Sequence, residues 1–457
     1  MVVGHFLHTR HARMSRDGSR VGIFSYAANT TEREALLEIY QWQDEDEDAE
    51  QEEKEWVQLG NTLNFGNRPI VFRMSGDGNR LLCGVRGEFA RVYQYDVTNE
   101  IWEPLGQDFL PPELDLASGR PRFPHSLDIS ATGHRIVLTY APEVYYLGSA
   151  LGFDDLFGYG RVWIYEYNDT DEWVLLGMEP LKDETSPWFG GMVTFSDDGS
   201  RVAIKRGEEL IHDEFDKQIS SGFRVYQQAD PSSIWQSIGT NSLAAVGHAD
   251  EADLSLNGSF MVLGTSCRNY DQYVLNICLG EIGTARVLRY NQADDAWERV
   301  GRELMGQAAG DIFGGQVSIS EDGSRLAVSE SEFNNRKGSV RTFVYDATSM
   351  EWKQDAGLEG VSNSSARLNF GSYCEISSDS SRMLVIAGGE SYARVYARNV
   401  SLVDSPWSTT PQPSEMPTQN PSEMQTQDRT SDTSDAKQML EQGISVVLVF
   451  TAILLYF

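Results

Sequence analysis

Short apolar runs rich in β-branched and aromatic residues alternate with polar turn segments along most of the chain. Examples of such runs are residues 91–95, 162–167 and 201–204, and polar turns such as 96–99 and 168–172 stand between them. Runs of this length and composition, bounded by turn residues, predict β-strands. We therefore expect an all-β chain.

One turn segment recurs seven times. Each copy has an apolar residue, a serine, and then Asp-Gly or a close variant, and an arginine follows in six of the seven copies. The glycine position is occupied by Gly18, Gly78, Gly133, Gly199, Gly258, Gly323 and Ser380, at intervals of 60, 55, 66, 59, 65 and 57 residues. Asp-Gly between two apolar runs predicts a tight hairpin with a type I′ turn. Each repeat unit therefore begins with a hairpin of two strands, A and B.

Every unit continues with a variable connection, a third strand C, a polar turn and a fourth strand D that carries a tryptophan. These tryptophans are Trp56, Trp102, Trp173, Trp235, Trp297, Trp352 and Trp407. A four-stranded sheet that is apolar on both faces needs neighbours on both faces, and radial stacking of sheets supplies them. The sequence thus predicts a seven-bladed β-propeller over residues 1–407, with units beginning near 5, 68, 123, 189, 248, 313 and 370, and with the tryptophans between blades. Two packed sandwiches are the alternative fold.

Phe-Gly pairs stand before several of the turns, at Phe189-Gly190, Phe313-Gly314 and Phe370-Gly371, with a weaker copy at Phe65-Gly66. The segments 188–199 and 312–323 resemble the Phe-Gly strand of FG-GAP propeller repeats, known from integrin α-chain heads. The resemblance implies a propeller and a cell-surface role. FG-GAP repeats that hold calcium carry a long acidic A–B loop, whereas the loop expected here is a two-residue turn. We therefore expect no metal and no other cofactor.

The composition changes after Trp407. Residues 408–442 are rich in Ser, Thr, Pro and Gln and predict a disordered, extended stalk, which resembles the Pro-Ser and Pro-Thr linkers of algal cell-surface proteins. Residues 443–457 form a hydrophobic tail. Small residues around Ser434, a polar spacer and this tail match a GPI-attachment signal with Ser434 as the attachment candidate, and a short membrane helix is the alternative. The expected location is the cell surface, anchored in the membrane.

The N-terminus does not fit this location. Residues 1–20 contain no apolar signal segment and are expected to enter strand A of the first blade directly, so we hypothesise a truncated gene model. Five glycosylation sequons agree with secretion: Asn29, Asn168, Asn257, Asn363 and Asn399.

Charge and cysteine content narrow the choice of partners. The net charge of −31 and the absence of basic clusters argue against nucleic acid and against docking on anionic lipid. Cys267 and Cys278 lie eleven residues apart within one expected loop, where a disulfide is an alternative to two free thiols. Cys83 and Cys374 lie in apolar runs and are expected as buried free thiols.

No catalytic motif is recognisable, and two functions remain. The favoured one is a non-catalytic, membrane-anchored extracellular module that recognises or adheres to a protein or glycan. The alternative is a propeller hydrolase, glycosidase-like, which needs carboxylates and arginines converging at the axis. Long B–C connections in blades 3, 4 and 5, at 140–160, 206–222 and 265–283, make their rim the expected contact surface. Its aromatic candidates are Tyr145, Tyr146, Phe153, Phe157, Tyr159, Phe215, Tyr270 and Tyr273, and the alternative is that they only pack the loops onto each other.

Overall fold

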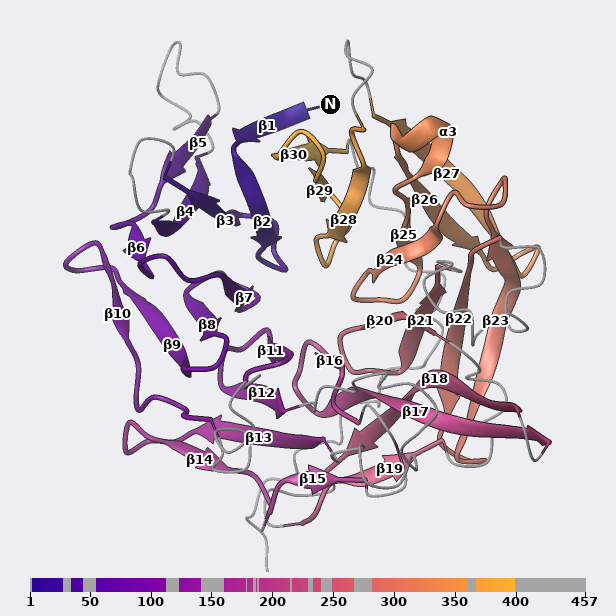
Figure 1. Ribbon diagram of the computed structural model, residues 1–457, viewed down its shortest axis with the longest axis horizontal. Coiled ribbons are helices and arrows are strands. Elements are labelled where there is room, and N and C mark those ends of the chain that lie inside the picture. The colour runs from indigo at the N-terminus through magenta and orange to yellow at the C-terminus, as the bar shows by residue number, and fades with distance from the viewer. Residues whose placement is uncertain are drawn as a thin grey trace, which may run out of the picture. The chain divides into compact units, whose positions relative to one another are not determined.

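The computed structural model describes residues 2–27, 34–43, 55–111, 123–140, 160–177, 179–183, 186, 189–213, 216–228, 233–239, 249–266, 282–360 and 367–398. Within them, seven antiparallel sheets of four strands each are arranged around a common centre (Figure 1), two of them with one additional short strand. The chain is a seven-bladed β-propeller, which confirms the predicted fold class. Strand A is innermost and strand D outermost in each blade.

The first three blades follow one another along the chain. Blade 1 contains β2 (Thr9–Met14), β3 (Arg20–Tyr26), β4 (Ala35–Gln43) and β5 (Glu55–Gln58), with β6 (Leu63–Asn64) also paired to β4. Blade 2 contains β7 (Ile70–Met74), β8 (Arg80–Val85), β9 (Phe89–Asp96) and β10 (Ile101–Pro104). Blade 3 contains β11 (Leu127–Ile129), β12 (Arg135–Tyr140), β13 (Arg161–Tyr167) and β14 (Trp173–Leu175), with β15 (Leu181–Lys182) paired to β13.

Blades 4 to 6 repeat the same order. Blade 4 contains β16 (Val193–Phe195), β17 (Arg201–Asp213), β18 (Asp216–Gln227) and β19 (Gln236–Ile238). Blade 5 contains β20 (Glu251–Leu254), β21 (Phe260–Thr265), β22 (Thr284–Asn291) and β23 (Ala296–Met305). Blade 6 contains β24 (Phe313–Ile319), β25 (Arg325–Glu330), β26 (Ser339–Asp346) and β27 (Glu351–Glu359), and the short α3 (Phe333–Arg336) connects β25 to β26.

Blade 7 joins the two ends of the propeller. It contains β28 (Phe370–Ile376), β29 (Arg382–Ala387) and β30 (Tyr392–Ala397), and its outermost strand is the N-terminal β1 (Val2–Leu7). The expectation that the chain enters strand A of blade 1 directly is therefore wrong. β1 first covers the outer edge of β30, pairing Leu7 with Tyr392, and so removes an unpaired strand edge. Trp407, which the repeat placed in this fourth strand, lies outside the described residues.

Seven clusters of buried apolar residues form the core within the described residues, and each combines residues from two neighbouring blades. The six strand-D tryptophans within the described residues belong to these clusters, as predicted. Trp102 and Trp173 are examples, since each places its indole N–H on a backbone carbonyl of the preceding blade, Leu59 for the former and Leu105 for the latter. The predicted buried free thiols are also confirmed for Cys83 and Cys374.

The A–B turns differ in detail from the predicted type I′ turn. In blade 4, Gly199 has a φ of +68°, but Asp198 is not among the residues with positive φ. Gly199 N–H donates to the Ser196 carbonyl at 2.8 Å, while the Asp198 carboxylate accepts from Ser196 Oγ and from the Ser200 N–H. The turn therefore needs positive φ only at the glycine. The aspartate is required for a different reason, because its carboxylate accepts the hydrogen bonds of the serine hydroxyl and of the N–H after the glycine.

The Phe-Gly pairs have a common structural role. Phe189, Phe313 and Phe370 are buried, and the glycine after each has a φ near +80°. A Cβ at Gly314 would lie 2.2 Å from the Thr284 carbonyl oxygen of the preceding blade. The pair therefore anchors a ring in the core and lets two backbones approach closely where strand A begins.

Candidate functional site

The innermost strands enclose a channel at the propeller axis. All seven blades contribute to its lining, and it contains a cavity of about 290 Å³. The charged side chains in the lining are Arg13, Arg16, Arg73, Asp128, Asp197, Glu251, Asp253 and Glu375. The arginines and carboxylates that the hydrolase alternative requires do meet here. The hydrogen bonds, ion pairs and pKa of each carboxylate therefore decide whether the channel is suited to hydrolysis.

One position of strand A recurs in all blades, two residues before the turn serine. It is occupied by Arg13, Arg73, Asp128, Thr194, Asp253, Ser318 and Glu375. Strand A has no partner on its channel side, so some backbone N–H groups there need side-chain acceptors. The acceptor comes from the preceding blade at four seams: Asp128 accepts from Phe195 N–H at 2.8 Å, Asp253 from Ile319 at 2.9 Å, Ser318 from Ile376 at 3.2 Å and Glu375 from Met14 at 3.1 Å.

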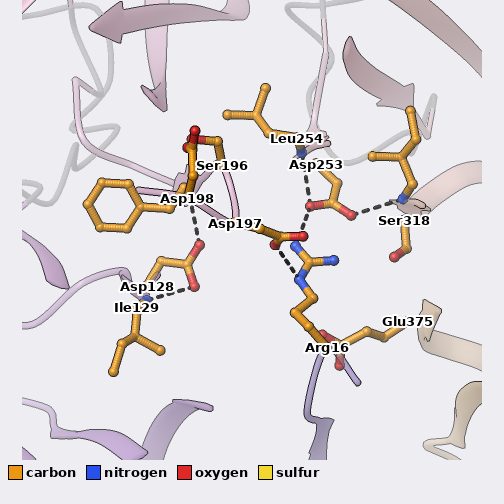
Figure 2. Close-up of polar contacts among 12 residues, drawn as sticks. Arg16, Asp128, Ile129, Ser196, Asp197, Asp198, Asp253, Leu254, Ser318 and Glu375 are labelled. Carbon is orange, nitrogen blue, oxygen red and sulfur yellow. Dashed lines mark hydrogen bonds and ion pairs between the residues drawn. The ribbon is translucent and has the colours of Figure 1, made fainter. Parts of the chain in front are cut away.

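Arg16 crosses the channel from blade 1 to the opposite side (Figure 2). Its Nε lies 2.8 Å from Asp197 Oδ1 in blade 4, and its Nη2 lies 3.2 Å from Asp253 Oδ1 in blade 5. Burial alone would lower the pKa of Arg16, but the two carboxylates outweigh it and raise that pKa well above its usual value. Burial also raises the pKa of Asp197 to about 6 in spite of Arg16. Arg16 thus connects blade 1 by ion pairs to blades 4 and 5, neither of which is a neighbour of blade 1.

The A–B turns form a closed circle at the same end of the channel. Each turn donates one backbone N–H to a carbonyl of the next turn: Asp17 to Gly76, Gly76 to Ala131, Ala131 to Asp197, Asp198 to Leu256, Leu256 to Glu321, Glu321 to Ser378 and Ser378 to Arg16. The last of these bonds, at 2.6 Å, joins blade 7 to blade 1. Propeller closure therefore has two components, this inner circle and the outer strand β1.

Glu251 is the channel carboxylate with the weakest structural role. Its Oε1 accepts one hydrogen bond, from Gln316 Nε2 at 2.8 Å, and burial raises its pKa to about 7. Across the lining, the guanidinium of Arg13 stacks on Tyr373 at 4.0 Å, and its Nε has no hydrogen-bond partner in the described part of the chain. These groups could orient a small polar ligand. Over the described residues no cluster of three His, Cys, Asp or Glu side chains suits a metal ion.

These axial residues were not among the predicted site residues. Their signal is present in the aligned repeats, where a charged or hydroxyl side chain interrupts an apolar strand at one fixed position. The signal is not sufficient by itself, because an isolated polar residue in a strand shows neither which way it points nor which blade supplies its donor.

All the predicted rim aromatics lie outside the described residues: Tyr145, Tyr146, Phe153, Phe157, Tyr159, Phe215, Tyr270 and Tyr273. The same holds for Cys267, Cys278, Asn29, Asn363, Asn399 and the lipid-attachment candidate Ser434. Of the sequon asparagines, Asn168 and Asn257 are described. Both lie in turns, Asn257 is exposed, and each accepts a hydrogen bond from the residue two positions later. Their glycosylation stays a prediction.

The B–C connection of blade 4 differs from the predicted loop. Strands β17 and β18 continue through it and pair up to Asp213 and Asp216, so that a hairpin replaces most of the loop. Strand β16 pairs with β17 only as far as Ile204, and β19 pairs with β18 only from Val225. The pairing ladders assigned to the described strands therefore leave both outer edges of this hairpin open (Figure 1).

No helix within the described residues has the length and hydropathy of a membrane span. The stalk and tail, residues 408–457, lie outside them, so their predicted roles stay predictions.

Comparison with known proteins adds little to this picture. No protein-family profile and no curated protein matches the sequence. Similar solved structures include the β-propeller domain of Cps50 (Swd1) from Myceliophteria thermophila, at 10% identity and a TM-score of 0.48, over 86% of this chain and 97% of that one. Another is the C-terminal WD40 domain of Sif2, at 11% identity and a TM-score of 0.48, over 87% and 98%. They do not confirm the FG-GAP resemblance, and the fold assignment stands on the sheet topology.

Proposed function

We propose that the chain is a non-catalytic recognition module, which binds a protein or glycan through the propeller face that carries the B–C and D–A connections. The observation that supports this most is the use of the axial carboxylates. Asp128, Asp253 and Glu375 accept backbone N–H groups across blade seams, and Asp197 pairs with Arg16. Carboxylates with these partners connect one blade to another, and they are poorly placed to transfer protons to and from a substrate.

The two faces of the propeller differ in a way that favours one of them for binding. At the A–B face the circle of turns surrounds the channel, and Arg16 crosses it. The opposite face carries the blade 4 hairpin, and a strand edge with open backbone groups can pair with an extended segment of a partner. We call this face the B–C face.

A test of the binding face compares two shortened variants of the full chain. Replacement of residues 207–221 by Asn-Gly removes the hairpin tip, and replacement of residues 97–100 by Asn-Gly is the matched control on the A–B face. We expect the first variant to lose binding to an array of glycans and to cells, and the control to retain it, with the unfolding midpoints of both close to that of the parent. Equal binding by both variants would contradict the proposal.

The glycosidase-like hydrolase remains a second candidate because of Glu251. A carboxyl group with a pKa of about 7 is suited to act as a general acid, and it faces a cavity that also contains Arg13 and Arg73. The test is a panel of aryl glycosides and sialosides incubated with the full chain and with Glu251→Gln. The recognition module predicts equal, background turnover by both proteins. Turnover that disappears in Glu251→Gln would replace it with the hydrolase.

The proposal also places the protein at the cell surface, held by residues 443–457. The apolar tail behind a Ser/Thr/Pro-rich segment and the FG-GAP-like Phe-Gly pairs support this location. Expressed behind a secretion signal, the full chain should be released from cells by a phosphatidylinositol-specific phospholipase. Retention on the cells after lipase treatment, with residues 443–457 still present, would favour a membrane helix in place of the lipid anchor.

A further inference from the structure

The seam between blades 6 and 7 contains a groove of about 470 Å³. Residues of β25, β26 and β27 line one side of it, and residues of β28, β29 and β30 line the other. Its floor is apolar, with Leu326, Phe343 and Met383 among the contributors, and Asp355 and Arg398 contribute charge to the lining. A groove of this size between blades is large enough for one or two side chains from elsewhere.

The strand-D tryptophans show what fills other seams. Trp102 lies against Gly60 of the preceding blade, and Trp352 lies against Gly301 in the same way. A Cβ at either glycine would come within 3.0 Å of the indole. The ring of Trp352 also packs on Tyr345 of its own blade, with centroids 5.3 Å apart. Each seam of this kind is thus closed by an indole between a glycine and a tyrosine.

The seam between blades 6 and 7 departs from this pattern on both sides. Its outermost strand β1 contains no tryptophan, and its pairing with β30 ends at Val2 and Tyr396. Arg398 stands where blade 2 has Tyr95, and Ala356 stands where blade 5 has Gly301. The edge opposite Arg398 is therefore not covered by β1, and the described residues that line the groove include no tryptophan.

Charge at the groove is only partly compensated. Asp355 lies 2.8 Å from Arg398 Nη1 but 3.8 Å from Arg325 Nη1. The Nη1 of Arg325 is buried and has no hydrogen-bond acceptor in the described part of the chain. One carboxylate thus serves two guanidinium groups, and the groove favours an occupant that combines an acidic group with an aromatic ring.

We infer that the chain's own segment 399–407 occupies this groove, with the Trp407 indole on its apolar floor and the Asp404 carboxylate beside Arg325. The segment continues directly from Arg398 in the lining, so a short turn suffices for its return. Trp407 follows Arg398 by nine positions, close to the seven that separate Tyr95 from Trp102. The N-terminal and C-terminal segments then share the fourth-strand position of blade 7.

The test uses tryptophan emission of the full chain. The difference spectrum between the parent and Trp407→Phe isolates Trp407, and the corresponding difference for Trp352→Phe gives the reference for an indole buried in a seam. We expect the Trp407 emission to match the blue-shifted reference and to resist acrylamide quenching. Ala356→Phe narrows the groove, and it should shift the Trp407 emission to that of an exposed indole.

A synthetic peptide of residues 399–409 gives an independent readout. It should bind the Trp407→Ala chain and compete poorly with the parent, in which the groove is occupied. Trp407 emission typical of an exposed indole in the parent, unchanged by Ala356→Phe, would overturn the inference and leave the groove to a separate partner. Failure of the peptide to bind Trp407→Ala would overturn it as well.

Discussion

At the scale of single residues, a few side chains of the repeat each make several of the contacts that hold the A–B turn. The serine and aspartate of each A–B turn satisfy the turn's own donors, and the glycine alone supplies the left-handed backbone. Ser380 is the exception, with a φ of +56° at the glycine position of blade 7. A serine in this conformation is strained, because its Cβ approaches the backbone.

Ser380→Gly should therefore stabilise the protein by up to about 1 kcal/mol, since glycine adopts positive φ without that strain. Gly323→Ser is the matched reverse change. It should be destabilising by more, because a Cβ at Gly323 would lie 2.5 Å from the Phe260 ring. Thermal unfolding midpoints of the two variants should move in opposite directions. A lower midpoint for Ser380→Gly would show that the serine hydroxyl matters more than the backbone.

Glu251 should make stability depend on pH. Its folded pKa of about 7 exceeds the ordinary value of 4.5, so the folded protein holds the proton more tightly than the unfolded chain. This contribution to the free energy of unfolding is complete below about pH 4.5 and is lost as pH rises through 7. The whole change amounts to about 3 kcal/mol. Glu251→Gln should therefore gain stability relative to the parent as pH rises from about 5 to 8. A constant difference between their unfolding midpoints would contradict this.

The axial residues show where prediction from sequence stops. The turn motif identified the glycine and aspartate positions because their role is local. Asp128 and Glu375 could not be assigned, since each serves a backbone donor of the next blade, more than fifty residues away for Asp128 and across the ring closure for Glu375. Sequence spacing does not show which strand forms the channel edge, where backbone N–H groups have no acceptor on a neighbouring strand.

At the scale of elements, strand B holds the neighbouring blade through the arginine of the repeat. Arg135 Nη1 donates to the Gly199 carbonyl of the next blade at 3.0 Å, and its Nε donates to Glu166 of its own blade. Arg80 and Arg201 make the same inter-blade bond. In blade 5 the position is Phe260, whose ring packs against Gly323 in place of the hydrogen bond.

Loss of this bond should be measurable. Arg135→Ala leaves the partly buried Gly199 carbonyl without its charged donor, and we expect a loss of about 2 kcal/mol. Arg302→Ala is the control, because its ion pair with Glu351 lies at the surface and should contribute under about 1 kcal/mol. Thermal unfolding of both variants gives the comparison. Equal losses would show that the inter-blade bond contributes no more than a surface ion pair.

The four-strand unit could be predicted element by element, but its ends could not. Strands A to C have apolar patterns and a turn motif between them, so their positions followed from the repeat. β1 carries no tryptophan and no turn signal, so nothing in its sequence pattern linked it to β30. The blade 4 hairpin was expected as a loop because its polar residues hide the continued pairing of β17 with β18.

At the scale of the whole molecule, the ring is closed twice in blade 7, once by β1 and once by the hydrogen bond from Ser378 to Arg16. The outer closure joins strands from opposite ends of the described chain. Such a closure gives every blade a neighbour on both faces and leaves only short strand edges uncovered.

Deletion of residues 2–7 should expose the edge of β30 and lower the unfolding midpoint. Because the inner circle of turns remains, we expect the propeller to stay folded but blade 7 to exchange its amide protons faster than the other blades. Hydrogen exchange followed by mass spectrometry tests this blade by blade. Uniformly faster exchange in all seven blades would instead show that β1 supports the ring as a whole.

The circle of turns also has a consequence for the electric field along the channel. All seven bonds donate in the same rotational sense, from each blade to the next, so the circle is homodromic. At Arg16–Asp17 and at Asp197–Asp198 the accepting carbonyl and the donating N–H belong to one peptide group, so the two bonds strengthen each other there, and the cycle has no terminal donor or acceptor left over. Its peptide dipoles run tangentially and largely cancel around the ring, unlike those of a helix, which add along one axis. The backbone circle therefore contributes little axial field at this mouth, and the potential that an approaching ion meets there comes from charged side chains, which include Arg16 with its two aspartates and turn carboxylates such as Asp77 and Asp379.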